Sequence, residues 1–100
     1  MVLSSNRTTL LANGNETAVL TAQLILPDDE GIVSENTRVI FRAELASTGT
    51  SIRELQRESL SNASGNAITS LFGRTMGLMR IIGTVDNLPS VADTLFIEFQ

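Results

Sequence analysis

The sequence lacks many of the side chains that enzyme chemistry usually requires. Its 100 residues include no cysteine, histidine, lysine, tryptophan or tyrosine, and only four phenylalanines. Without cysteine the chain has neither a disulfide nor a thiol nucleophile. Without histidine and lysine, a serine or threonine nucleophile lacks its usual base. The few aromatic rings also leave little surface on which sugars or bases could stack. These absences predict a protein that is not an enzyme.

Positive charge is scarce as well. Seven basic residues, all arginine, stand against 11 acidic ones, which gives a formal net charge of −4 and a pI near 4.6. The arginines are scattered along the sequence, whereas binding to nucleic acid or to anionic lipid requires clustered basic side chains. No segment approaches the roughly 20 apolar residues that span a bilayer. We therefore expect no nucleic-acid partner and no direct insertion into a membrane.

What the chain does contain is regular alternation. From Ala18 to Leu26 every second residue is apolar, and the pattern returns over residues 79–85 and 95–99. Successive side chains of a β-strand point to opposite faces, so each alternating run predicts a strand with one apolar face. Turns rich in Asn, Asp, Gly and Pro separate the runs. The sequence therefore predicts one all-β sandwich domain, for which 100 residues is a suitable length.

The order of the elements follows from these runs and turns. Strands are predicted at residues 2–5, 8–11, 17–26, 37–45, 67–72, 78–85 and 93–99, the second continuing the first after a kink at Asn6 and Arg7. Turns are predicted at residues 13–15, 28–31, 62–66 and 86–90. The segment 51–60 fits one or two helical turns, because Ile52 and Leu55 lie three apart, but it also fits an edge strand. The sandwich context favours the edge strand or a loop.

These landmarks occur in a recognisable order. A Leu-Ala-Asn-Gly segment at 11–14 leads into the strand at 17–22, and an acidic turn at 28–31 precedes the strand at 37–41. A small-residue turn at 62–67 opens the next strand, and the segment 77–86 is followed by a last strand that ends Ile97-Glu98-Phe99. Over nearly its whole length the chain resembles the bacterial immunoglobulin-like domains of group 1, which are the modules of intimin and invasin surface proteins.

This resemblance implies an all-β, immunoglobulin-like Greek-key β-sandwich of about seven strands in two antiparallel sheets. It implies that residues 1–100 form a single domain of a longer exported chain, located outside the cell or on the bacterial surface. The implied function is a non-catalytic spacer or adhesion module. Its partners would be neighbouring domains, other protein subunits, or a host-surface or carbohydrate ligand. The family brings no catalytic residue and no cofactor. A structural or assembly domain of a phage or fibre is the alternative function, and gene context would separate the two.

Acidic side chains offer a candidate metal site. Asp28, Asp29 and Glu30 carry carboxylate oxygens of the kind that Ca²⁺ prefers, and Asp86 or Asp93 could join them from another loop. Consecutive turn residues rarely converge on one ion, so a solvated turn is the favoured interpretation. Calcium-dependent binding is therefore the weaker alternative function.

Acid–base catalysis would have to use carboxylates alone. Glu54 and Glu58 form a candidate pair, provided that their surroundings set their pKa values apart. Arg53 and Arg57 flank them in the sequence. A surface charge network among these four residues is the favoured interpretation.

The outward faces of the predicted strands carry many large apolar side chains. If Ala18 and Met79 point inward, the outward set is Val19, Ile25, Ile40, Ile68, Phe72, Ile82 and Phe96. Two interpretations stay open: these side chains form a contact surface for another domain or copy, or loops and a shifted register account for them. We predict Phe72, Ile82 and Phe96 as the contact surface. Open strand edges at 2–5 or 93–99 would add strand pairing.

Overall fold

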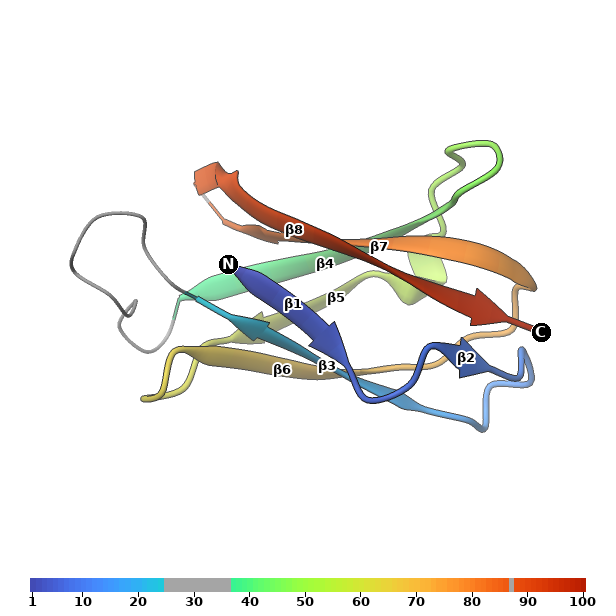
Figure 1. The fold of residues 1–100 in the computed structure, drawn as a ribbon, viewed down its shortest axis with the longest axis horizontal. Helices are drawn as coiled ribbons and strands as arrows, with labels where there is room; N and C mark the ends of the chain where they lie inside the picture. The colour runs from blue at the N-terminus through green and yellow to red at the C-terminus, as the bar shows by residue number, and fades with distance from the viewer. Residues whose placement is uncertain (25–36, 87) are drawn as a thin grey trace.

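Two β-sheets pack face to face in the computed structural model, which describes residues 1–24, 37–86 and 88–100, with the backbone alone at 88–91 (Figure 1). The three-stranded sheet has the order β1 (Val2–Ser5), β3 (Ala18–Gln23) and β6 (Asn66–Leu71). The five-stranded sheet has the order β2 (Thr9–Leu10), β8 (Leu88–Phe99), β7 (Gly77–Val85), β4 (Arg38–Leu45) and β5 (Arg57–Leu60). The predicted all-β sandwich is confirmed. Within the described residues, no helix has the length and apolar character needed to cross a membrane.

The core lies between the sheets and consists of the alternating residues that the sequence singles out. The buried set from the patterned strands is Ala18, Leu20, Ala22, Val39, Phe41, Ala43, Met79, Ile81, Val85, Ile97 and Phe99. Leu95 is partly buried and packs against this cluster. Fully burying one large aliphatic or aromatic side chain contributes about 1.5–3 kcal/mol, so the alternation itself carries most of the stability of the fold. Leu26, the last residue of the first pattern, lies outside the described residues.

The first predicted strand changes sheets at its kink. β1 pairs antiparallel with β3, whereas β2 pairs parallel with β8 through Thr9 and Leu10. Asn6 closes the first ladder, since its amide donates to the carbonyl of Val19 (3.2 Å) and its side-chain oxygen accepts from the amide of Val19 (2.8 Å). The chain then crosses to the other sheet. This parallel pair corrects the prediction of purely antiparallel sheets, and it shortens the strand expected at 8–11 to two residues.

The last strand is longer than predicted. β8 begins at Leu88, so the turn expected at 86–90 is reduced and the strand expected at 93–99 gains residues at its start. Thr84 pairs with Ala92 but Val85 pairs with Leu88, which leaves residues 89–91 in a bulge. Proline has no amide hydrogen to donate, and a bulge is a position where a strand tolerates it. Pro89 therefore falls inside the strand instead of ending the turn.

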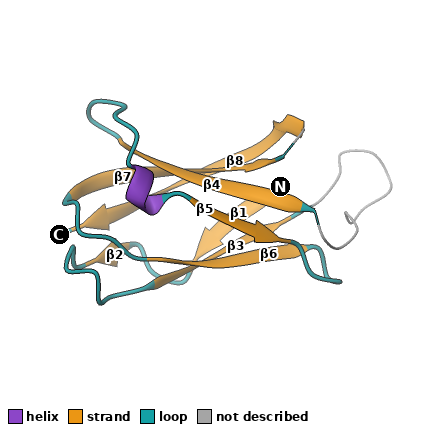
Figure 2. Cartoon of the chain, turned by 180° about the vertical axis from the view of Figure 1, so that it is seen from behind, coloured by secondary structure: helices purple, strands orange, loops and turns teal. Residues whose placement is uncertain are grey.

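The ambiguous segment 51–60 contains both of the structures that its sequence fits. One 3₁₀ turn, η1 (Arg53–Leu55), precedes β5, which pairs with β4 at the edge of the five-stranded sheet (Figure 2). Leu55 is 1% exposed and anchors the turn in the core. Gly73 passes so close that a Cβ at this position would lie 2.5 Å from Leu55 Cδ2. A glycine in the β6–β7 connection thus makes room for η1.

Side chains from the five-stranded sheet cover both outer edges of the three-stranded sheet. On the β1 side, the amide of Leu3 donates to Asp93 Oδ2 at 2.9 Å. On the β6 side, Arg57 Nε donates to the carbonyl of Ser70 at 3.2 Å, and Ser59 Oγ donates to that of Ile68 at 2.8 Å. Exposed strand edges invite pairing with another chain. At these positions the edges are occupied from within the molecule, so β1 is not open at Leu3.

Candidate functional site

The three residues predicted as a contact surface do not share one face. Ile82 on β7 and Phe96 on β8 belong to the five-stranded sheet, whereas Phe72 follows β6 in the three-stranded sheet. Phe72 is 44% exposed, Phe96 is 48% exposed, and Ile82 is partly buried. The outward direction of Phe72 and Phe96 is therefore confirmed, and the contact surface itself stays a prediction. The structure offers two separate outer faces in place of one continuous patch.

The other outward positions follow the same alternation. Val19 and Ile68 are exposed on the three-stranded sheet, and Ile40 is partly buried on the five-stranded sheet. Ile25 lies outside the described residues. No register shift is needed for the exposed side chains, since β3 and β6 pair without interruption from Ala18 to Gln23. The interpretation that rested on a slipped register is wrong for this sheet.

Each exposed phenylalanine lies beneath an arginine that is itself held in place. The guanidinium carbon of Arg57 lies 5.0 Å from the ring centroid of Phe72, and that of Arg80 lies 5.8 Å from the centroid of Phe96. Both distances suit cation–π attraction, which contributes about 0.5–1 kcal/mol at exposed sites. Arg80 also forms an ion pair with Glu44 across the β4–β7 ladder. The exposed rings are therefore flanked by oriented positive charges.

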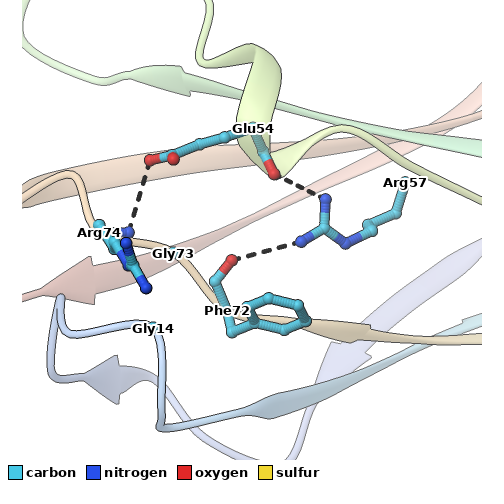
Figure 3. Close-up of a pocket in the computed structure, with 6 residues that line it drawn as sticks. All are labelled: Gly14, Glu54, Arg57, Phe72, Gly73 and Arg74. Atoms are coloured by element: carbon cyan, nitrogen blue, oxygen red, sulfur yellow. Dashed lines mark hydrogen bonds between the residues drawn. The ribbon is translucent and has the colours of Figure 1, made fainter.

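A hollow of about 280 Å³ lies between η1 and the β6–β7 connection (Figure 3). Its lining residues are Gly14, Glu54, Arg57, Phe72, Gly73 and Arg74. Arg57 Nη1 donates to the carbonyls of Glu54 (2.7 Å) and Gln56 (2.9 Å), while Nη2 reaches that of Phe72 (3.4 Å). Most of the donors of Arg57 are thus used inside the protein. The side chain fastens β5 to β6 and leaves the Phe72 ring accessible at the rim.

The carboxylates considered for acid–base chemistry have separate partners. Glu54 Oε1 accepts from Thr75 Oγ1 at 2.6 Å and from the amide of Arg74 at 3.5 Å. The Thr75 hydroxyl, more than any other group, holds the pKa of the Glu54 carboxyl below its usual value. Glu58 forms an ion pair with Arg38 at 3.6 Å. The predicted charge network with Arg53 and Arg57 is wrong in its partners, because the sequence does not reveal which strands pair with β5.

The candidate calcium residues Asp28, Asp29 and Glu30 lie outside the described residues. In the part of the chain that the structure describes, no group of three or more acidic residues is placed to hold a metal ion. Asp93, considered as a contributing ligand, instead accepts the amide hydrogen of Leu3. That bond, more than any other, lowers the pKa of the Asp93 carboxyl.

Sequence reasoning identified the exposed rings but missed the arginines that cover them. Arg80 and Phe96 are direct cross-strand neighbours in the β7–β8 ladder. Both positions are outward by alternation, so the pair could have been found once the register of the two strands was known. Arg57 on β5 reaches Phe72 across the side of the sandwich, because β5 and β6 belong to different sheets and share no backbone ladder. No local pattern in the sequence indicates that contact.

The fold defines the class of protein: an immunoglobulin-like β-sandwich whose first strand is shared between the two sheets. Solved structures of intimin have this fold. A C-terminal 282-residue fragment of intimin, in complex with the intimin-binding domain of the translocated intimin receptor, matches with a TM-score of 0.73 and 21% identity. The D0–D1 domain of intimin matches with a TM-score of 0.72 and 21% identity.

The match covers 99% of this chain in both cases, but only 32% of the first structure and 46% of the second. This chain thus spans about a third of the length of the first intimin fragment and just under half of the second. No protein-family model matches the sequence, and neither does any curated protein. The fold expected from the resemblance to intimin modules is confirmed.

Proposed function

We propose that this domain is a non-catalytic immunoglobulin-like module of a bacterial surface or secreted protein, where it acts as a spacer with protein-contacting faces. The observation that carries the proposal is the likeness of fold to intimin fragments along 99% of the chain. The intimin fragment solved with a receptor domain indicates that chains of this architecture take part in protein–protein binding.

The shape of the domain supports a spacer role. Its principal extents are 41 × 25 × 18 Å, so the domain is elongated along one axis. Gln100 lies at one tip of that axis and Met1 lies in the other half of the molecule (Figure 1). A chain that enters in one half of the domain and leaves at the opposite tip adds part of the long dimension of the domain to a stalk (Figure 1). Side-chain hydrogen bonds across both flanks of the sandwich support this role, because they tie the two sheets together.

The chemistry of the described carboxylates supports a non-catalytic role. A general acid needs a carboxyl pKa that is raised towards the working pH. The pKa of Glu54 is instead lowered by its hydrogen bonds, and Glu58 is held by Arg38. The environment of Glu54 does not resemble that of a proton donor, and histidine, cysteine and lysine are absent from the whole sequence.

The outer faces support contact with neighbouring domains or other subunits. Phe72 projects from one sheet and Phe96 from the other, each beside an arginine. Aromatic residues and arginine are the types most enriched where binding energy concentrates. Exposed phenylalanines on both outer faces also favour the second candidate function, an assembly domain of a phage or fibre. In such a particle, neighbouring subunits would cover both faces.

The experiment that tests the proposal uses the full-length parent protein. Deletion of residues 1–100 should lower the height of its distal end above the surface by up to the 41 Å long axis, measured by atomic force microscopy. A Phe72→Ser/Phe96→Ser double variant of the same protein is the matched control, since it removes the contact rings and keeps the length. The spacer role predicts an unchanged height for this variant and weaker contact with neighbouring domains or partners. An unchanged height after the deletion contradicts it, and disassembly of a particle by the double variant favours the assembly domain.

A further inference from the structure

The arginines of this domain are not equally occupied. Three form ion pairs: Arg7 with Glu16, Arg38 with Glu58, and Arg80 with Glu44. Arg57 is bonded to backbone carbonyls. The guanidinium groups of Arg42, Arg53 and Arg74 have neither a hydrogen bond nor an ion pair among the described residues, and all three side chains are exposed. In a chain of net charge −4, three unpaired cations need an explanation.

The three unpaired arginines surround η1. Arg42 on β4 and Arg53 at the start of η1 line one small hollow together. Arg53 and Arg57 line a second, open hollow of about 590 Å³, and Arg57 and Arg74 line the third, shown in Figure 3. Consecutive hollows therefore share an arginine. Four arginines that are scattered in the sequence therefore line adjoining hollows, together with Glu54 and Glu58. We call these four residues the arginine band: Arg42, Arg53, Arg57 and Arg74.

The acidic groups near the band are already engaged. The Glu54 carboxylate accepts from Thr75 and from the amide of Arg74, and its pKa is lowered first by the Thr75 hydrogen bond and also by the charge of Arg74. Glu58 lines the hollow of Arg53 and Arg57, but it forms an ion pair with Arg38. At one end of the band the stem of Arg74 lies close over Gly14, where a Cβ would lie 2.9 Å from Arg74 Nε. The arginine stem can lie over this position only because glycine has no side chain. Arg74 and Phe72 line the same hollow from different sides (Figure 3).

We infer that the arginine band binds an acidic segment of a partner protein, with glutamate or aspartate side chains along the band and an apolar side chain against Phe72. Arginine presents planar, paired donors that match a carboxylate, so unpaired guanidinium groups fit this chemistry well. Charge complementarity steers such a partner toward these unpaired arginines. The Phe72 ring is 44% exposed and gives an apolar side chain of a peptide a surface to pack against, and an acidic glycan is the competing occupant that the test separates. This inference goes beyond the spacer role and does not depend on it.

The test measures binding of two probes to the intact domain by isothermal titration calorimetry and by ¹⁵N nuclear magnetic resonance at low salt. The first probe is an oligoglutamate peptide that carries one phenylalanine, and the second is a heparin oligosaccharide of similar charge. We expect the peptide to bind and to shift the Nε–H resonances of Arg42, Arg53 and Arg74 more than those of Arg38 and Arg80. Added salt should weaken binding, as for any contact between exposed charges.

Two double variants separate the band from general charge. Arg53→Gln/Arg74→Gln removes two unpaired arginines and should weaken peptide binding by about tenfold or more, since each loses a charge-assisted hydrogen bond. Arg7→Gln/Arg38→Gln removes the same charge from ion-paired positions and should weaken binding less than about threefold. All four positions are exposed, and circular dichroism verifies the fold of both variants. Equal losses from the two variants, or no binding of the peptide, overturn the inference. Binding of heparin without binding of the peptide also overturns it and assigns the band to an acidic glycan.

Discussion

Arg57 should contribute more to stability than its position at the surface suggests. Four of its hydrogen bonds end on backbone carbonyls of residues 54, 56, 70 and 72, and its guanidinium lies 5.0 Å from the Phe72 ring centroid. Hydrogen bonds from a charged donor contribute about 1.5–3 kcal/mol when shielded, and solvent reduces this to roughly 0.5 kcal/mol each here. The cation–π contact adds about 0.5–1 kcal/mol. Ordering one arginine side chain offsets about 1 kcal/mol of this sum.

The expected loss of stability for Arg57→Ala is therefore about 2 kcal/mol. For a domain of this size, that corresponds to a decrease in Tm of roughly 8–16 °C. Urea unfolding followed by circular dichroism gives the free energy of unfolding directly. Arg57→Lys should lose more than half of the same amount, because an ammonium group cannot reach several carbonyls in the fork geometry of a guanidinium.

The matched control is Arg53→Ala, four residues earlier in the sequence. Arg53 is exposed and its side chain makes no hydrogen bond within the described residues, so the substitution should change stability by less than about 0.5 kcal/mol. A double-mutant cycle with Phe72→Leu isolates the ring contact and should give a coupling energy of about 0.5–1 kcal/mol. If Arg57→Ala and Arg53→Ala destabilise the protein equally, the fastening of β5 to β6 by Arg57 is refuted.

Two further substitutions test close packing and pH dependence. Gly73→Ala should destabilise the domain by about 1–3 kcal/mol, because the added Cβ would lie 2.5 Å from Leu55 Cδ2. Gly49→Ala, with nothing within 4 Å, should cost only the strain of its φ of +73°, about 1 kcal/mol, and thermal unfolding compares the two. For Asp93, the amide of the first strand lowers the carboxyl pKa in the folded state, so the unfolded chain binds protons more readily. Its stabilising effect is complete above about pH 4 and is lost as the pH falls through the folded pKa. Asp93→Asn should therefore lower Tm more at pH 7 than near pH 3; equal effects at both pH values would contradict this.

Alternation predicted the fold well because it reports a physical requirement that is local. A residue such as Leu20 or Ile81 must face the core, and its neighbours must face away, whichever strands lie beside it. The prediction of which side chains of the long strands face the core and which face away is therefore correct wherever the structure describes them. The parallel pairing of β2 with β8 was missed because two residues carry no periodicity. The sequence does not predict the bulge that contains Pro89, because the Asp, Asn, Pro and Ser residues at 86–90 equally suit a turn.

The candidate site depended more on contacts between distant segments. The exposure of Phe72 and Phe96 follows from alternation, but their separation onto two sheets follows from the strand order. The arginine band depends even more on contacts between distant segments, since its members lie on β4, η1, β5 and the β6–β7 connection. In the sequence the arginines are scattered, and glutamates close to them partly offset their positive charge. Only the three-dimensional arrangement shows which arginines are paired and that the unpaired ones are neighbours.

The residues that hold the sandwich together are also the ones that shape its contact surfaces, and this overlap has a consequence for binding. Arg57 and Arg80 are fixed by backbone carbonyls and by Glu44, so their guanidinium groups already lie over exposed rings before any partner arrives. A side chain that is ordered in the free protein has little conformational entropy left to lose on association. Such pre-organised arginine–phenylalanine pairs should therefore bind with less entropic cost than the free arginines of the band. For the same reason, a substitution at Arg57 affects stability and binding together, whereas the unpaired Arg42, Arg53 and Arg74 can report on binding alone.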